Sequence, residues 1–368
     1  MDFALSDEQR ALQDTVRSYL RDRFGPAQLR AVYDDPDGDG IPAELWKAMG
    51  EQGWLAVLVP EQYDGLGLGL LDTAVLARGF GAGAVPGPWL GTVLAGEAVR
   101  LAGSAEQQGH WLPRLATGSV VGAVALSRPG SSPSPANAPA TASDGRVSGQ
   151  LDLVEYAESA EVLVVASGES LHLVDPRGEG VSIERVAAMD RTSRLGTVHL
   201  DGALADPLPG SSDEVTQELL DRAAVLVANE LAGIARAALT KTVEYDKTRV
   251  QFGRPVGSFQ AIKHALADLH VAVTMAEHAG LYAAYAIDAD RADKSLAVSI
   301  AKSKAADTAR QATSDMIQYH GGIGYTWEHD AHVYFKRAKR LEYAYGDAAQ
   351  HRERIAHILI DRADQTGA

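Results

Sequence analysis

Apolar and small residues recur at three- and four-residue spacing near both ends of the chain, which is the period of helices with one buried face. Near the N-terminus, Ser6 is followed three residues later by Gln9, the spacing of a capping box, so a helix is expected from there to about Phe24. A second helix is expected from Pro42, and Gly53 ends it. The first part of the chain is therefore predicted to be helical.

The C-terminal part shows the same spacing in four long spans with short connections. The spans are 215–247, 257–288, 291–320 and 345–362. The third ends at a pair of glycines, Gly321 and Gly322, as helices with a glycine stop do. Four long helices joined by short connections predict a four-helix bundle.

Between these helical parts lie short runs of β-branched and apolar residues, broken by prolines and glycines. Strands are expected at 120–126, 162–166, 171–174 and 197–200. The stretch 128–144 has few bulky apolar residues and is expected to be a mobile loop. The sequence therefore predicts an α+β protein with an N-terminal helical domain (1–120), a middle β-barrel or sandwich (121–212) and a C-terminal four-helix bundle (213–368).

Composition narrows the possible functions. The chain has no cysteine, which excludes disulfides, cysteine-ligated metals and thiol catalysis. Its net charge of −15 opposes binding to nucleic acid or to anionic membranes. The acidic N-terminus does not resemble a signal peptide, and no uninterrupted apolar stretch is long enough for a membrane span, so a cytoplasmic location is expected.

Two short motifs in the C-terminal part contain candidate binding residues. Arg249 precedes Phe252 and a glycine, and Gln260 follows eight residues after Phe252. A guanidinium donates in a fork to phosphate oxygens, and a glycine lets the backbone approach closely. Gln318 precedes the glycine pair described above, whose other interpretation is a simple helix end. A glycine-rich run at 63–69 lacks the strand and the lysine of a phosphate loop, and is interpreted as a connection between helices.

The order of the three parts, together with these motifs, resembles the acyl-CoA dehydrogenase family over nearly the whole chain. The resemblance implies that FAD is the cofactor and an acyl-CoA thioester the substrate. In that family the arginine meets the FAD pyrophosphate, the aromatic packs near the cofactor and the glutamine-glycine turn meets the adenosine. It implies FAD contacts for Arg249, Phe252, Gln260, Gln318, Gly321 and Gly322. These segments serve the flavin of a neighbouring subunit, so an oligomer is expected.

The resemblance fails where the catalytic base should be. The family abstracts a proton with a glutamate, and in this chain that position is Gly346. Asp347 is the nearest acid and is either the base or the N-cap of the following helix. Glu342 is a weaker candidate. The base of some relatives lies near Asp221, but two residues out of register.

The middle domain also departs from the family. Ser127 keeps a hydroxyl that would contact the flavin, but Arg128 replaces the expected acid and a Gly-Ser-Asp element is missing. Glu155 falls where a threonine near the flavin is expected, and its carboxylate would repel a reduced, anionic flavin. Groups that would act on the chain's own flavin are therefore lost, while groups that would touch a partner's flavin remain.

This pattern leads to the hypothesis of a helper subunit in an α2β2 acyl-CoA dehydrogenase, similar to those of steroid side-chain oxidation, with electrons passing to an electron-transfer flavoprotein. Three alternatives stay open: a self-sufficient homotetramer that uses Asp347, a flavin-free structural subunit, and a flavin oxygenase on the same scaffold. His320, His329 and His332 lack the spacing of a zinc site, and no metal is expected.

Overall fold

The computed structural model describes residues 5–361, which form two compact units. The first unit comprises Met1–Gln28, Ala74–Val85 and Ala224–Ala368, and the second comprises Leu29–Thr73 and Pro86–Ala223. Three helices pass from one unit into the other: α2 (Pro26–Tyr33), α4 (Leu70–Ala82) and α7 (Asp213–Thr248).

The second unit contains a seven-stranded sheet, in which β1 and β4 pair in parallel and the other pairs are antiparallel. The strand order is β1-β4-β5-β7-β3-β2, with β6 paired to β7. The strands are β1 (Gly122–Ala125), β2 (Ala140–Ser143), β3 (Arg146–Glu155), β4 (Val162–Ser167), β5 (Ser170–Val174), β6 (Val181–Val186) and β7 (Leu195–Pro207). The α+β fold and all four expected strands are confirmed, although β7 is longer than expected.

Three strands, β2, β3 and β6, were not expected from the sequence. In β3 the ladder to β7 shifts register between Val147 and Gly149 and again between Leu151 and Val154, which disturbs the simple apolar alternation. The expectation of a mobile loop at 128–144 is wrong. A 3-10 turn, η2 (Pro135–Asn137), and β2 occupy its second half, and the backbone N–H of Arg128 donates to the Asn137 carbonyl at 3.0 Å.

The remaining elements of the second unit are helical: α3 (Ala43–Glu51), η1 (Glu61–Tyr63), α5 (Trp89–Ala102), α6 (Ala105–Ala116) and η3 (Ala157–Ser159). The glycine-rich run after η1 folds back on the preceding segment. A Cβ at Gly65 would lie 1.9 Å from the Val59 carbonyl oxygen. A glycine is therefore required here for backbone packing.

The first unit is helical and confirms the expected bundle. It contains α1 (Asp7–Arg23), most of α7, α8 (Gln260–Asp288), α9 (Lys294–Tyr319), α10 (Ala331–Tyr343) and α11 (Ala348–Ala356), with the short elements β8 (Val250–Gln251), β9 (Arg254–Pro255), η4 (Val256–Ser258), η5 (Gly321–Tyr325) and η6 (His357–Asp361). The capping box at Ser6 is present, because Ser6 accepts from the Gln9 backbone at 3.2 Å and Gln9 accepts from the Ser6 backbone at 3.1 Å.

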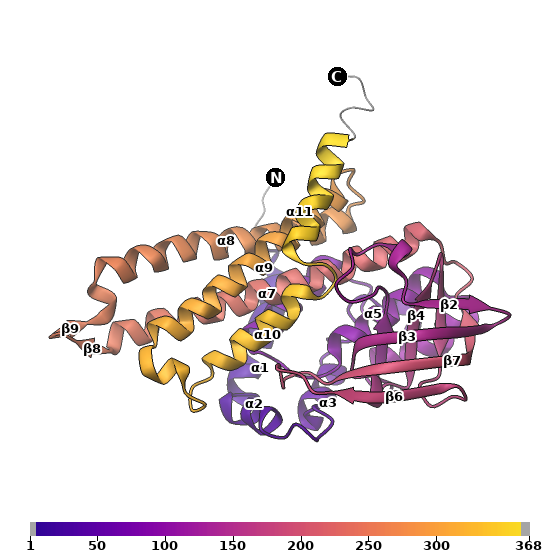
Figure 1. Cartoon of the computed structure of the whole chain (residues 1–368), viewed down its shortest axis with the longest axis horizontal. Helices are drawn as coiled ribbons and strands as arrows, with labels where there is room; N and C mark the ends of the chain where they lie inside the picture. The colour runs from indigo at the N-terminus through magenta and orange to yellow at the C-terminus, as the bar shows by residue number, and fades with distance from the viewer. Residues whose placement is uncertain (1–4, 362–368) are drawn as a thin grey trace. The chain divides into compact units, whose positions relative to one another are not determined.

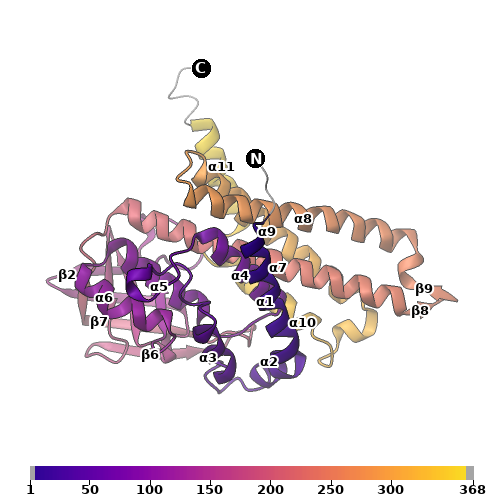
Figure 2. The ribbon, with the colours of Figure 1, turned by 180° about the vertical axis from the view of Figure 1, so that it is seen from behind.

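Helix α9 is the centre of this unit and packs against α8, α10 and α11. Its buried face is made of small residues, which lets its neighbours approach closely. Helix α10 was not expected as a separate helix. Helices α7 and α8 run to a common tip at the β8–β9 hairpin, as both views show (Figure 1, Figure 2).

By length and composition, α7 is the one described helix that satisfies the criteria for a membrane span, with a mean hydropathy of 1.4 over its most apolar window. The protein itself buries 83% of that window. A buried core helix meets the same criteria, and this burial accounts for its apolar composition.

Candidate cofactor and active site

The tip of the α7–α8 hairpin presents Arg249 and Phe252 to solvent. The strands β8 and β9 are joined by Phe252 and Gly253, which have φ of 53° and 76°. Two residues with positive φ are typical of a type I′ turn, but a phenylalanine in this conformation is rare. The Phe252 side chain is 92% exposed. Arg249 makes no hydrogen bond or ion pair through its side chain within residues 5–361.

The second motif lies at the end of α9. Gly321, with φ of 63°, follows the last turn as a left-handed stop, and Gln318 is exposed beside it. His320 is buried, its ring stacks on Tyr245 at 4.4 Å between centroids, and the tilted ring of His329 lies 4.3 Å away. Tyr245 is in the last turn of α7, and its carbonyl accepts from the backbone N–H of Arg249 at 2.9 Å, so this stack holds the two motifs at the same end of the bundle.

The state of His320 follows from its surroundings. Nδ1 lies 2.7 Å from the Met316 carbonyl, which only accepts, so the ring proton is on Nδ1. Burial lowers the pKa of His320. The His320 ring is therefore uncharged at pH 7 and packs between α7 and α9.

Glycines leave open space around this end of the bundle. No atom lies within 4 Å of a Cβ built at Gly253, Gly321 or Gly322. The backbone is therefore accessible there to a flat or phosphate-bearing ligand. An exposed guanidinium, an exposed amide at Gln318 and open backbone together form a donor set for the pyrophosphate and adenosine half of a dinucleotide.

The candidate acids lie at the other end of α9. Gly346 is buried with φ of 92°, and Asp347 is the N-cap of α11. The Asp347 carboxylate accepts from the Gln350 backbone at 2.8 Å, while Gln350 accepts from the Asp347 backbone at 2.9 Å. Glu342 is paired with Lys339 at 2.7 Å. Both carboxylates are therefore engaged within the chain.

Two buried basic side chains, which the sequence analysis missed, hold the segment around Gly346. Lys302 on α9 is fully buried, and its Nζ donates to the carbonyls of Glu342 at 2.9 Å and Gly346 at 2.7 Å. His351 Nε2 donates to the Tyr345 carbonyl at 2.9 Å. Burial lowers the pKa of Lys302 to about 7 and that of His351 to about 3. The only sequence signal was that Lys302 falls on the small-residue face of α9.

The two ends are far apart. Lys302 and Gln318 are separated along one straight helix by roughly 24 Å, at about 1.5 Å of rise per residue. Asp347 and the Arg249–Gln318 end therefore lie at opposite ends of α9. Ser127 follows β1 in the second unit and is partly exposed. Within residues 5–361 no three His, Asp or Glu side chains lie close enough to hold a metal ion.

Comparison with known proteins identifies two matching family models. Residues 6–119 match the acyl-CoA dehydrogenase N-terminal domain, and residues 214–360 match the acyl-CoA dehydrogenase C-terminal domain. Acyl-CoA dehydrogenase IpdE2 of Mycobacterium tuberculosis is 36% identical over 336 residues, which cover 90% of this chain and 91% of the relative.

Solved structures with the same fold agree with the family-model matches. The Tcur3481-Tcur3483 steroid ACAD G363A variant aligns with a TM-score of 0.88 at 30% identity, covering 97% of this chain and 99% of that one. The ChsE4-ChsE5 complex from Mycobacterium tuberculosis aligns with a TM-score of 0.88 at 27% identity, covering 98% and 99%.

Proposed function

This chain belongs to the acyl-CoA dehydrogenase family, and we propose from that premise that it is one subunit of a heteromeric, FAD-dependent enzyme whose other subunit supplies the catalytic base. As a family member it is an oxidoreductase that acts on a CH–CH bond. The observation that carries the proposal is the state of the base position: Gly346 stands there, buried and with a left-handed backbone.

The residues at the hairpin tip fit FAD. The open space at Gly253, Gly321 and Gly322 is where backbone N–H groups would meet its phosphates, and Arg249 would hold the pyrophosphate. Gln318 and Gln260 would contact the adenosine, and Phe252 would pack beside it. The chemistry that bound FAD would supply here is hydride acceptance from the acyl β-carbon.

This chain's own part in the reaction is positional. Arg249 neutralises phosphate charge, and the glycines admit the cofactor without a steric barrier. At the other end, Lys302 and His351 fix the segment 342–347 through its carbonyls. A proton acceptor at the substrate α-carbon must be a free carboxylate in a dry pocket. Because Asp347 and Glu342 are both engaged, the proposal assigns that acceptor to the partner.

The separation of the two ends along α9 is consistent with an oligomer, and the names of two aligned structures favour a heteromer. The Arg249 end and the Gly346 end would serve different cofactors if the family's arrangement across subunits applies. Two of the aligned structures are named for two gene products, Tcur3481-Tcur3483 and ChsE4-ChsE5, and the first is named a steroid enzyme. A bulky, steroid-like acyl-CoA is accordingly the proposed substrate, and an electron-transfer flavoprotein the proposed electron acceptor.

The alternatives rest on weaker observations. A homotetramer using Asp347 would require the α11 cap to open and release the carboxylate. A flavin-free subunit would leave the exposed Arg249, Gln318 and glycines without a role. A flavin oxygenase would also need no base, and its oxygen consumption distinguishes it.

The test is to purify the chain alone and after co-expression with the dehydrogenase-like protein whose gene lies nearest to its own, and to measure FAD content, mass and desaturation of acyl-CoA. The expected result is FAD and activity only in the complex of both proteins. Stoichiometric FAD and desaturation by the lone chain would refute the proposal. In that case, loss of activity in Asp347→Asn, with the exposed Asp201→Asn as the control, would identify Asp347 as the base.

A further inference from the structure

Three helices cross within the first unit at points where glycines let them approach closely. A Cβ at Gly79 on α4 would lie 2.8 Å from Val16 Cγ1 on α1. A Cβ at Gly233 on α7 would lie 2.0 Å from the backbone carbonyl oxygen of Arg78 on α4. Long side chains that flank these contacts on α1, α4 and α7 are therefore brought together from segments that are distant in the sequence.

Each of these helices carries an arginine beside the crossing: Arg17 on α1, Arg78 on α4 and Arg236 on α7. Burial is the main cause that lowers the pKa of Arg78, and the positive charges of Arg236 and Arg17 lower it further. Glu277 on α8 is the acid that raises it. Three guanidinium groups therefore lie around one carboxylate.

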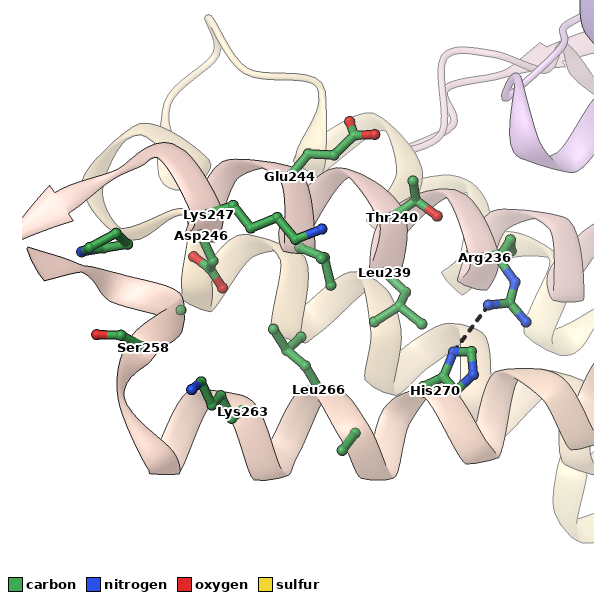
Figure 3. A pocket seen from close by; sticks show the side chains of 14 residues that line it. Arg236, Leu239, Thr240, Glu244, Asp246, Lys247, Ser258, Lys263, Leu266 and His270 are labelled. Carbon is green, nitrogen blue, oxygen red and sulfur yellow. Dashed lines mark hydrogen bonds between the residues drawn. The ribbon is translucent and has the colours of Figure 1, made fainter.

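The Glu277 carboxylate already has Arg236 as its partner. Arg236 Nε donates to one carboxylate oxygen at 3.0 Å, and Nη2 donates to the other at 2.5 Å. The same guanidinium donates from Nη2 to Thr274 Oγ1 at 3.2 Å, and its Nη1 lies 3.3 Å from Nδ1 of His270, the contact drawn as a dashed line in Figure 3. Arg236 and Glu277 therefore satisfy each other.

Arg78 has no such partner. It is half-buried, and its side chain makes no hydrogen bond or ion pair within residues 5–361. Arg17 is 70% exposed, and its ion pair with Asp14 is long, at 3.9 Å. A partly desolvated guanidinium whose N–H donors are all unpaired is costly, and two like charges beside it add to that cost. The arrangement therefore calls for an anion.

The free donors indicate which anion fits. The guanidinium of Arg78 presents a planar fork that binds two oxygens of one anion, and Arg17, on a neighbouring helix, can donate to a third. Phosphate has that third oxygen and a carboxylate does not. We propose that Arg78 and Arg17 form a binding site for a phosphate group, with Arg236 adding positive charge. Free phosphate and a phosphorylated metabolite share this chemistry.

This phosphate site is distinct from the one assigned to FAD. Arg236 precedes Arg249 by 13 residues, which is roughly 20 Å along α7 at about 1.5 Å of rise per residue. Binding of phosphate at Arg78 requires neither FAD nor a second subunit. Its failure would therefore leave the proposed function standing.

The test is isothermal titration calorimetry of inorganic phosphate into the purified full chain at constant ionic strength, with acetate and pyrophosphate as comparison ligands. Saturable binding of one phosphate per chain is expected, with acetate binding at least about tenfold more weakly because it lacks the third oxygen. Pyrophosphate that binds more tightly than phosphate would assign the site to a phosphorylated metabolite. Pyrophosphate that binds no more tightly would assign it to the free ion.

The variants remove one guanidinium at a time. Arg78→Gln should weaken phosphate binding at least about tenfold, since charged hydrogen bonds are lost. It should not lower the melting temperature in phosphate-free buffer, because Arg78 has no partner in the free chain. Arg17→Gln should weaken binding several-fold. The matched control is Arg23→Gln, which changes an exposed arginine on another face of α1 and should leave both quantities unchanged.

Arg249→Ala is the second control, because a pyrophosphate site at the hairpin tip would also attract inorganic phosphate. Phosphate binding that is lost in Arg249→Ala and kept in Arg78→Gln would overturn the inference. So would the absence of saturable binding in the wild type. A lower melting temperature of Arg78→Gln in phosphate-free buffer would also refute it, since Arg78 would then have its counter-ion within the chain. If Arg78→Gln does not fold, an unchanged affinity in Arg17→Gln would refute the site.

Discussion

The two ends of α9 hold their polar groups in opposite ways. At the Lys302 end, a fully buried ammonium and a buried histidine are bound to three backbone carbonyls. At the Gln318 end, Arg249, Gln318 and two glycines are exposed and have open space in front of them. Groups that are satisfied within the chain hold its fold, whereas groups left open are available to a ligand or another subunit. The family's base position falls at the closed end.

The largest effect is expected from opening the closed end with Lys302→Met. Methionine keeps the volume but leaves the carbonyls of Glu342 and Gly346 without donors. Each unsatisfied buried group costs about 1–3 kcal/mol, so the free energy of unfolding should fall by about 2–4 kcal/mol in urea titration. Lys304→Met, on the same helix but partly exposed, is the control and should change it by less than about 0.5 kcal/mol.

The same substitution should also change how the free energy of unfolding depends on pH. The pKa of Lys302 is about 7 in the folded chain and has its usual value of 10.5 when unfolded. Between these values the unfolded chain binds the extra proton, so this group makes the free energy of unfolding rise with pH from about 7 to 10.5. Lys302→Met should remove that rise. If the rise persisted in the variant, Lys302 would not be the group that titrates, and the contrast between the two ends would fail.

At the open end, Arg249→Ala should leave the fold intact and weaken FAD binding. The guanidinium makes no contact within the described chain, so stability should change by less than about 0.5 kcal/mol. Loss of a charged hydrogen bond to phosphate costs about 1.5–3 kcal/mol, which is roughly a 10- to 150-fold rise in the Kd for FAD of the assembled enzyme. Arg254→Ala, whose guanidinium lies over Phe259 at 4.0 Å, is the matched control. A destabilised Arg249→Ala protein with unchanged FAD affinity would place this arginine among the structural groups.

The sequence allowed the candidate residues of the open end to be predicted, but not the contacts that hold the closed end. The residues of the open end could be named from the sequence because they form compact motifs along the chain: Arg249 with Phe252, and Gln318 with Gly321. The closed end depends on contacts across 40 or more residues, such as Lys302 with Glu342 and Gly346, and local spacing does not report them.

In the fold too, elements defined by a local pattern were predicted, whereas elements that depend on distant partners were missed. Helices with a long apolar or small-residue face, such as α8 and α9, were predicted within a few residues. Strand β3 was missed because bulges break its alternation. The segment 128–144 was expected to be mobile from its composition, yet the partner strand β3 gives β2 its hydrogen bonds. In these cases the tertiary partner, which the local pattern does not contain, decides the structure.

The smallest effects come from two neighbouring glycines at the open end. Gly321 has φ of 63°, whereas Gly322 has an ordinary backbone, and neither has any atom within 4 Å of a Cβ position. Gly321→Ala should therefore destabilise the chain by about 1 kcal/mol through strain. Gly322→Ala should leave the melting temperature unchanged, since its methyl group meets nothing in the free chain. If FAD lies against this backbone, the same methyl group would occupy cofactor space and raise the Kd for FAD several-fold. Comparing thermal unfolding with FAD titration for both variants separates strain from contact. An unaltered FAD affinity in Gly322→Ala would mean that the turn is only a helix end.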